Sequence, residues 1–195
     1  MQNLPVDLLE KNDNMTNYYY FKNYFNDEKI QLIKNIAENY PIIPGNVSGV
    51  IDKSYRSSKI KWIPYNDETK WLYDEIIKLA KIANNDMWKF KLSNVKDEIQ
   101  FTEYNAEDEG HYDWHLDFGG SRSSTRKLSI VIQLTDPNEY KGGELQFLYS
   151  RSPVNAPNSK GSVIFFPSYL LHRVKKIEYG TRNSLVCWFH GPTFS

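Results

Sequence analysis

The stretch that decides the fold is G-H-Y-D-W-H-L-D-F-G-G-S-R-S-S-T-R-K-L-S-I-V-I-Q-L, residues 110–134. It contains two runs in which apolar residues recur at every second position, 114–118 and 127–134. This period of two is typical of a strand with one buried face. The Gly- and Ser-rich residues 119–125 between the runs have the composition of a mobile loop, and we predict that this loop closes over a substrate.

The same period continues on both sides of this stretch. We predict further strands at 88–92, 98–104, 144–148, 161–166 and 182–189, separated by clusters of Gly, Pro, Asn and Asp. Many short strands without helices between them favour an antiparallel sandwich or barrel of the jelly-roll type.

The first third of the chain has a different pattern. Apolar residues spaced by three and four predict one helix between the cap-like Asn26-Asp27 and Pro41, and a second over 67–83, ending at Asn84. Residues 50–63 read as extended, and 18–21 as either an edge strand or part of an interface. We expect one domain over 1–195, with helical support and edge strands in 1–85 and the β core in 86–195.

Composition excludes several classes of protein. The 195 residues contain 24 Lys and Arg against 24 Asp and Glu, so the net charge of zero gives no support for a nucleic-acid partner. A single Cys187 excludes an intrachain disulfide framework. No apolar run is long enough for a membrane helix, and residues 1–15 lack a secretion signal. We therefore expect a soluble, cytoplasmic protein without a membrane partner; the oligomeric state stays open.

Two of the four histidines suggest a metal site. His115 and Asp117 fall on the same face of a predicted strand, and His172 follows a strand far along the chain. Two imidazoles and one carboxylate form the facial triad of non-haem Fe(II) oxygenases. Arg182 comes ten residues after His172. Its guanidinium can hold a carboxylate through two hydrogen bonds, which suits a dicarboxylate co-substrate.

At this point the sequence resembles a known family. The strings that carry the resemblance are G-H-Y-D-W-H-L-D, L-S-I-V-I-Q-L-T-D-P-N-E-Y-K-G-G-E-L, F-F-P-S-Y-L-L-H-R-V and G-T-R-N-S-L-V-C-W. They look like the 2-oxoglutarate and Fe(II)-dependent dioxygenases, and within them the prolyl-hydroxylase branch with its PKHD-type hydroxylases. The resemblance covers about residues 97–190. It implies a mainly β protein with flanking helices and a double-stranded β-helix (jelly roll) core.

The resemblance also implies roles for individual residues. The implied iron ligands are His115, Asp117 and His172. The residues implied to bind 2-oxoglutarate are Arg182, Tyr104 and Gln133, although some prolyl hydroxylases have a Tyr at the position of Gln133. The implied substrate-side residues are Tyr112, Arg126, Trp188 and His190. Fe(II), 2-oxoglutarate and O2 are the implied cofactors and co-substrates, with ascorbate as a reductant.

The implied reaction is hydroxylation of an unactivated C–H bond, with release of succinate and CO2. The favoured substrate is a prolyl residue in a protein or peptide. A carboxylate at Asp117 implies hydroxylation, because related halogenating enzymes have a small residue there. Two alternatives remain open: the same chemistry on a small molecule such as a free amino acid, and a non-catalytic, cupin-like metal-binding protein.

Overall fold

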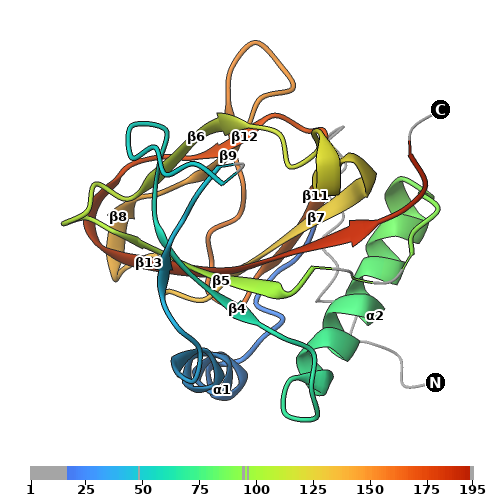
Figure 1. Cartoon of the computed structure of the whole chain (residues 1–195), viewed down its shortest axis with the longest axis horizontal. Coiled ribbons are helices and arrows are strands. Elements are labelled where there is room, and N and C mark those ends of the chain that lie inside the picture. Colours follow the sequence, from blue (N-terminus) through green and yellow to red (C-terminus); the bar gives the residue numbers. More distant parts are fainter. Residues whose placement is uncertain (1–16, 48, 94, 96, 194–195) are drawn as a thin grey trace.

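Two antiparallel sheets face each other in the computed structural model, which describes residues 17–47, 49–93, 95 and 97–193 (Figure 1). The larger sheet has the strand order β1-β11-β7-β13-β5-β4-β2, with β8 beside part of β13, and the smaller has the order β10-β9-β12-β6-β3. This arrangement confirms the predicted jelly roll. The elements are β1 (Tyr19–Phe21), α1 (Asp27–Glu38), β2 (Ile43–Pro44), β3 (Arg56–Ser57), β4 (Lys59–Ile63), α2 (Lys70–Met87), β5 (Ile99–Asn105), β6 (His111–His115), a 3₁₀ helix (Ser121–Thr125), β7 (Arg126–Gln133), β8 (Tyr140–Gly142), β9 (Leu145–Phe147), β10 (Val154–Asn155), β11 (Val163–Pro167), β12 (His172–Val174) and β13 (Ile177–His190).

Helices α1 and α2 cover the outer face of the larger sheet, away from the smaller one (Figure 1). Their buried residues, such as Ile33 and Ile76, belong to one apolar cluster with Leu128, Ile130 and Leu185 of the sheet. The opposite face of the same sheet contributes Val131 to a second cluster, which lies between the two sheets. Strand β7 is therefore buried on both faces, and residues 127–133 are all buried although apolar residues occupy only 128 and 130–132.

The two predicted helices form, but the boundaries of the second one differ from the prediction. Helix α1 begins after Asn26, whose side chain accepts a hydrogen bond from the Lys29 amide. Helix α2 begins at Lys70 because residues 66–69 form a turn in which Asn66 and Thr69 exchange backbone and side-chain hydrogen bonds. It continues past Asn84 to Met87, so the predicted stop at Asn84 was wrong.

The strand predicted at 88–92 does not form. The Asn84 side chain accepts a hydrogen bond from the Phe90 amide and donates one to the Phe90 carbonyl, which takes up both groups that a strand would pair. Lys89 adopts a positive φ of 55° at the turn out of α2. In the segment predicted as extended, 50–63, only 56–57 and 59–63 are strands.

The strand predicted at 114–118 lies instead at His111–His115, and the other predicted strands of the β core are confirmed, with changes of a few residues at their ends. The largest change is in β13, which begins at Ile177 rather than at Arg182. Residues 19–21 form the edge strand β1, paired with β11. No helix in the described part of the chain is long and apolar enough to cross a membrane. Residues 1–15, predicted to lack a secretion signal, lie outside the described residues.

Candidate active site

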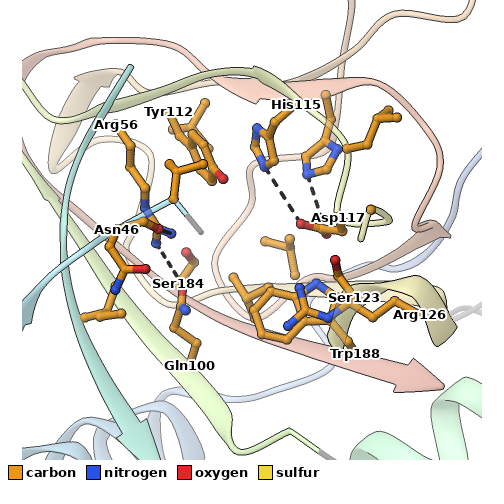
Figure 2. A pocket seen from close by; sticks show the side chains of 18 of the residues that line it. Asn46, Arg56, Gln100, Tyr112, His115, Asp117, Ser123, Arg126, Ser184 and Trp188 are labelled. Carbon is orange, nitrogen blue, oxygen red and sulfur yellow. Dashed lines mark hydrogen bonds and ion pairs between the residues drawn. The ribbon is translucent and has the colours of Figure 1, made fainter. Parts of the chain in front are cut away.

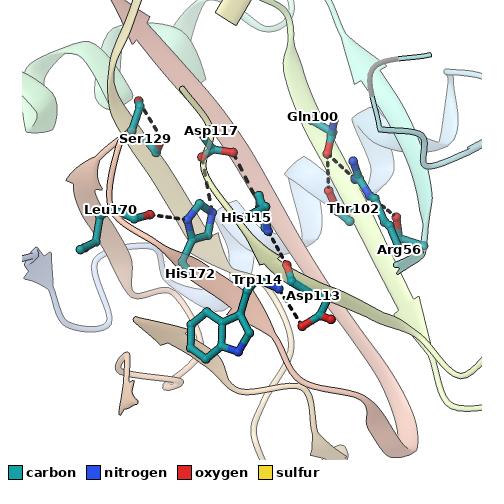
Figure 3. A network of polar contacts seen from close by, with 12 residues as sticks. Arg56, Gln100, Thr102, Asp113, Trp114, His115, Asp117, Ser129, Leu170 and His172 are labelled. Carbon is teal, nitrogen blue, oxygen red and sulfur yellow. Dashed lines mark hydrogen bonds and ion pairs between the residues drawn. The ribbon is translucent and has the colours of Figure 1, made fainter. Parts of the chain in front are cut away.

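Three potential metal ligands meet where β6 ends and β12 begins (Figure 3). His115 and His172 are directly paired between the two strands, and their ring centroids are 4.1 Å apart. Oδ1 of Asp117 lies 3.8 Å from Nε2 of His115, and Oδ2 lies 3.6 Å from Nε2 of His172. All three ligand atoms lie within 4.8 Å of one another. These residues can therefore hold one ion on a single face, as a facial triad does.

Backbone carbonyls orient both imidazoles. Nδ1 of His115 lies 2.7 Å from the Asp113 carbonyl, and Nδ1 of His172 lies 2.8 Å from the Leu170 carbonyl. A carbonyl accepts only, so each Nδ1 donates its proton and each Nε2 keeps a lone pair. Both lone pairs face Asp117 (Figure 3). Such outer hydrogen bonds fix the ring tautomer and orientation in metal sites.

The ionisation of the three groups also suits a metal. Burial, followed by the neighbouring His172 ring, lowers the pKa of His115 to about 3. For Asp117, burial opposes ionisation, but the His172 and His115 rings outweigh it and hold the pKa of the carboxyl below its usual value. At neutral pH the site therefore presents neutral His115 and a carboxylate, which are the forms that bind cations.

Asp117 reaches this position by a different route from the one predicted. The strand predicted at 114–118 ends at His115, so strand alternation does not orient Asp117. Beyond the strand, the chain is held by a 2.9 Å hydrogen bond from the Phe118 amide to the Ser168 carbonyl. Leu116, predicted to be buried on the far face, is 46% exposed and lines the cavity described next. The convergence of His115 and Asp117 is correct, but its geometric reason was wrong.

The triad opens onto a cavity of about 640 Å³ between the two sheets (Figure 2). This volume is in the range of small-molecule sites. Of the ten residues predicted for the site, eight line the cavity: Tyr104, Tyr112, His115, Asp117, Arg126, His172, Arg182 and Trp188. Gln133 and His190 do not.

Arg182 lies on β13 and is 1% exposed. Its Nη2 donates a 2.9 Å hydrogen bond to Oε1 of Gln133, whereas Nε and Nη1 have no partner among the described residues. Gln133 therefore orients Arg182 from outside the cavity. Tyr104, opposite Arg182 on β5, places its ring 5.7 Å from the guanidinium carbon. Buried donors without acceptors lower the stability of a protein, so this position suits the carboxylate of a bound ligand.

Arg126, Trp188 and His190 form a second group at the other end of the cavity. The Arg126 guanidinium lies 3.8 Å from the Trp188 ring centre and donates from Nε and Nη2 to Oδ2 of Asp97, at 3.0 and 2.7 Å. His190 Nε2 lies 3.1 Å from the same Asp97 oxygen. His190 thus contacts the residue that holds Arg126 and does not face the cavity.

Tyr112 covers one triad residue. Its ring stacks on that of His115 with centroids 3.5 Å apart and an interplanar angle of 12°. Residues 119–125 lie beside the triad, and Gly119, Gly120 and Ser123 line the cavity. They include the 3₁₀ helix Ser121–Thr125, and the closure predicted for this segment stays a prediction.

The sequence did not identify the cavity residues of the N-terminal half. Asn46, Arg56 and Trp62 line the cavity, together with Gln100 at the start of β5. Arg56 is only 7% exposed. Its one sequence signal is a cation within a segment predicted to be extended, which is common on surfaces and therefore carries little information.

Comparison with known proteins gives a consistent result. Residues 99–190 match the family model of the 2OG-Fe(II) oxygenase superfamily. A PKHD-type hydroxylase of Prochlorococcus marinus strain MIT 9515 is 31% identical over 144 residues, which are 72% of this chain and 64% of that protein. A PKHD-type hydroxylase of Crocosphaera subtropica is 33% identical over 95 residues, 47% of this chain and 42% of that protein. The chain thus spans less than two thirds of the length of these relatives.

Solved structures share the fold. A prolyl-4-hydroxylase of Pseudomonas putida superposes with a TM-score of 0.72 at 18% identity, covering 91% of this chain and 94% of that one. A prolyl hydroxylase of Trichoplax adhaerens, solved in complex with a peptide fragment of the hypoxia inducible factor oxygen degradation domain, gives a TM-score of 0.76 at 18% identity, covering 91% and 84%. At this identity the likeness concerns the fold.

Proposed function

Because this chain belongs to the 2OG-Fe(II) oxygenase superfamily, we propose that it is a 2-oxoglutarate-dependent hydroxylase that acts on a prolyl residue of a protein or peptide. One observation carries the proposal. A facial triad and a buried arginine with two unpaired donors line the same cavity. Neither feature is needed for stability, because apolar side chains at the same positions would stabilise the fold equally well.

The triad residues fit Fe(II). His115, Asp117 and His172 supply two imidazole nitrogens and a carboxylate, and leave the cavity side open for a co-substrate and O2. When bound, the iron supplies O2 activation coupled to decarboxylation of 2-oxoglutarate, with succinate and CO2 as products. The chain itself contributes the ligands and their fixed geometry.

Arg182 fits the distal carboxylate of 2-oxoglutarate. Its Nε and Nη1 have no partner among the described residues, so they are charge-assisted donors that a carboxylate can accept from. Gln133 holds the third nitrogen, so the fork is already oriented before the co-substrate binds. The Tyr104 hydroxyl is a further candidate donor, because Tyr104 lines the cavity and lies beside Arg182.

A peptide substrate is supported by the aromatic and cationic lining of the cavity. Tyr112, Arg126 and Trp188 line the cavity, and Leu116 adds an exposed apolar side chain to the lining. Aromatic and arginine side chains are the residue types that most often anchor peptides. The two similar solved structures are prolyl hydroxylases, one of them with a bound peptide.

The test combines two products of one reaction. The purified protein is incubated with Fe(II), 2-oxoglutarate, ascorbate and a set of proline-containing peptides, and we expect succinate and a peptide that gains the mass of one oxygen atom in equal amounts. Succinate with hydroxylation of free proline, but of no peptide, would replace the peptide by a small molecule. No response to 2-oxoglutarate would favour the cupin-like alternative. Asp117→Ala is the control that should produce neither product.

A further inference from the structure

A second buried cation lines the cavity, on the strand next to the triad. Arg56 lies on β3, opposite Tyr112 of β6, and its guanidinium carbon is 4.6 Å from the centre of the Tyr112 ring (Figure 2). Although it is 7% exposed, no carboxylate of the described residues forms an ion pair with it. Buried charges are usually paired, so a cation of this kind points to a ligand.

The hydrogen bonds of Arg56 hold it without neutralising it. Nε donates to Oγ of Ser58 at 2.8 Å, Nη1 to the Asn46 carbonyl at 3.2 Å, and Nη2 to Oε1 of Gln100 at 2.9 Å (Figure 3). All three acceptors are neutral. A guanidinium has five N–H donors, so two remain after these three bonds. The side chain is therefore fixed in place with donors to spare.

The charges around the cavity leave Arg56 without a counter-ion. Among the described residues that line it, the charged groups other than the histidines are Arg56, Arg126, Arg182 and Asp117. Arg126 is paired with Asp97. When a divalent ion and a dicarboxylate co-substrate are bound, their charges cancel each other, and the negative charge of Asp117 cancels the positive charge of Arg182. One positive charge then remains, at Arg56.

From this arrangement we infer that Arg56 binds a carboxylate of the substrate, and so selects substrates that carry an acid group close to the hydroxylated residue. The inference rests on the proposed function, because that function places the hydroxylated residue beside the triad. Arg56 acts here as a specificity residue, with Asn46 and Gln100 as its positioning residues. Two sources supply the same chemistry: an Asp or Glu side chain, or a free chain terminus.

Binding rather than turnover gives the sharpest test. Peptides are titrated anaerobically, by calorimetry, into protein loaded with Fe(II) and 2-oxoglutarate. One pair of end-capped peptides has either aspartate or asparagine after its proline; a second pair ends in proline as the free acid or as the amide. A charge-assisted hydrogen bond predicts that one acid peptide binds about tenfold to a hundredfold more tightly than its neutral twin. The pair that shows the difference identifies the source of the carboxylate.

Substitution at Arg56 assigns the effect to this residue. Arg56→Gln should remove the preference for the acid peptide, while the affinity for 2-oxoglutarate stays unchanged. Arg173→Gln is the matched control, because Arg173 lies 4.5 Å from the Trp114 ring centre and donates to Gln146 outside the cavity. It should keep the preference. The two peptide pairs keep the test decisive on the unaltered protein if Arg56→Gln does not fold.

The outcomes separate this inference from the proposed function. If a peptide is hydroxylated, but the acid and neutral peptides of each pair bind with equal affinity, the Arg56 assignment is overturned and the proposed hydroxylase function stands. A loss of 2-oxoglutarate affinity in Arg56→Gln, with peptide preference intact, also overturns it. A preference for acid peptides without any hydroxylation supports the Arg56 site and refutes prolyl hydroxylation.

Discussion

Replacement of Arg182 by methionine separates a functional buried charge from a structural one. In the ligand-free protein, Nε and Nη1 of Arg182 have no partner among the described residues. Arg182→Met therefore removes one hydrogen bond that stabilises the fold, the bond to Gln133. Methionine keeps much of the side-chain volume. We therefore expect the variant to fold and to lose the co-substrate site.

The magnitudes follow from the count of hydrogen bonds. A 2-oxoglutarate carboxylate that accepts from two N–H groups of the Arg182 guanidinium gains two charge-assisted bonds of about 1.5–3 kcal/mol each. Their loss weakens binding by about 3–6 kcal/mol, roughly two to four powers of ten in Kd. In the free protein, loss of the hydrogen bond to Gln133 destabilises the variant by about 1 kcal/mol. Removal of two buried donors that lack partners stabilises it by about 1–3 kcal/mol for each donor. The free energy of unfolding should therefore be unchanged or higher in the variant.

The assay is thermal and denaturant unfolding of both proteins, with Fe(II) under anaerobic conditions, in the absence and presence of 2-oxoglutarate. Saturation at a hundred times Kd should stabilise the unaltered protein by about 2.7 kcal/mol and leave Arg182→Met unchanged at the same concentration. Arg182→Lys, which keeps the charge but not the fork, should fall between the two.

The opposite pattern would refute this reasoning. If Arg182→Met lost the roughly 3–5 kcal/mol that removal of one partner from a buried ion pair costs, Arg182 would be a structural residue. If 2-oxoglutarate stabilised the variant as much as the unaltered protein, the co-substrate carboxylate would bind elsewhere.

Three further substitutions test other parts of the site. Asp117→Ala removes the only carboxylate of the triad and should lower Fe(II) affinity by about a hundredfold or more, measured by anaerobic titration; unchanged affinity would contradict the ligand assignment. Asp97→Asn removes the charge that holds Arg126 and should raise the KM for peptide about tenfold with the KM for 2-oxoglutarate unchanged; equal changes in both would argue against a substrate-side role. Gly110→Ala places a Cβ 2.6 Å from the Asn105 amide nitrogen and should lower the free energy of unfolding by about 1–3 kcal/mol. Gly120→Ala is the control, because no atom of a non-adjacent residue lies within 4 Å of its Cβ, and it should leave the free energy of unfolding unchanged. Equal stability of the two variants would show that the turn before β6 can accommodate a Cβ without loss of stability.

The parts of the fold that sequence reasoning found are those with local causes. Strand β7 was readable because Leu128, Ile130 and Ile132 share one face and a strand has a period of two. The metal site was readable because His115 and Asp117 are close in sequence, and because His172 follows a recognisable strand. Each of these signals needs only a short window of residues.

The errors arose where a side chain acts over a longer distance. Asn84 looked like a helix stop, but its amide bonds both backbone groups of Phe90, so the helix continues and the next strand is lost. Arg56 was overlooked because its meaning depends on Gln100, 44 residues away, and on Tyr112 across the sheet. Neither partner can be inferred from the residues around Arg56.

Anaerobic titration of the metal-free protein with Fe(II), followed by 2-oxoglutarate, tests the central claim most directly. We expect the visible charge-transfer absorption of an Fe(II)–2-oxoglutarate chelate to appear, to decay when O2 is admitted with formation of succinate, and to be absent in Asp117→Ala. Iron binding to the unaltered protein without this absorption would contradict the assignment of the cavity as a shared site for the metal and the co-substrate.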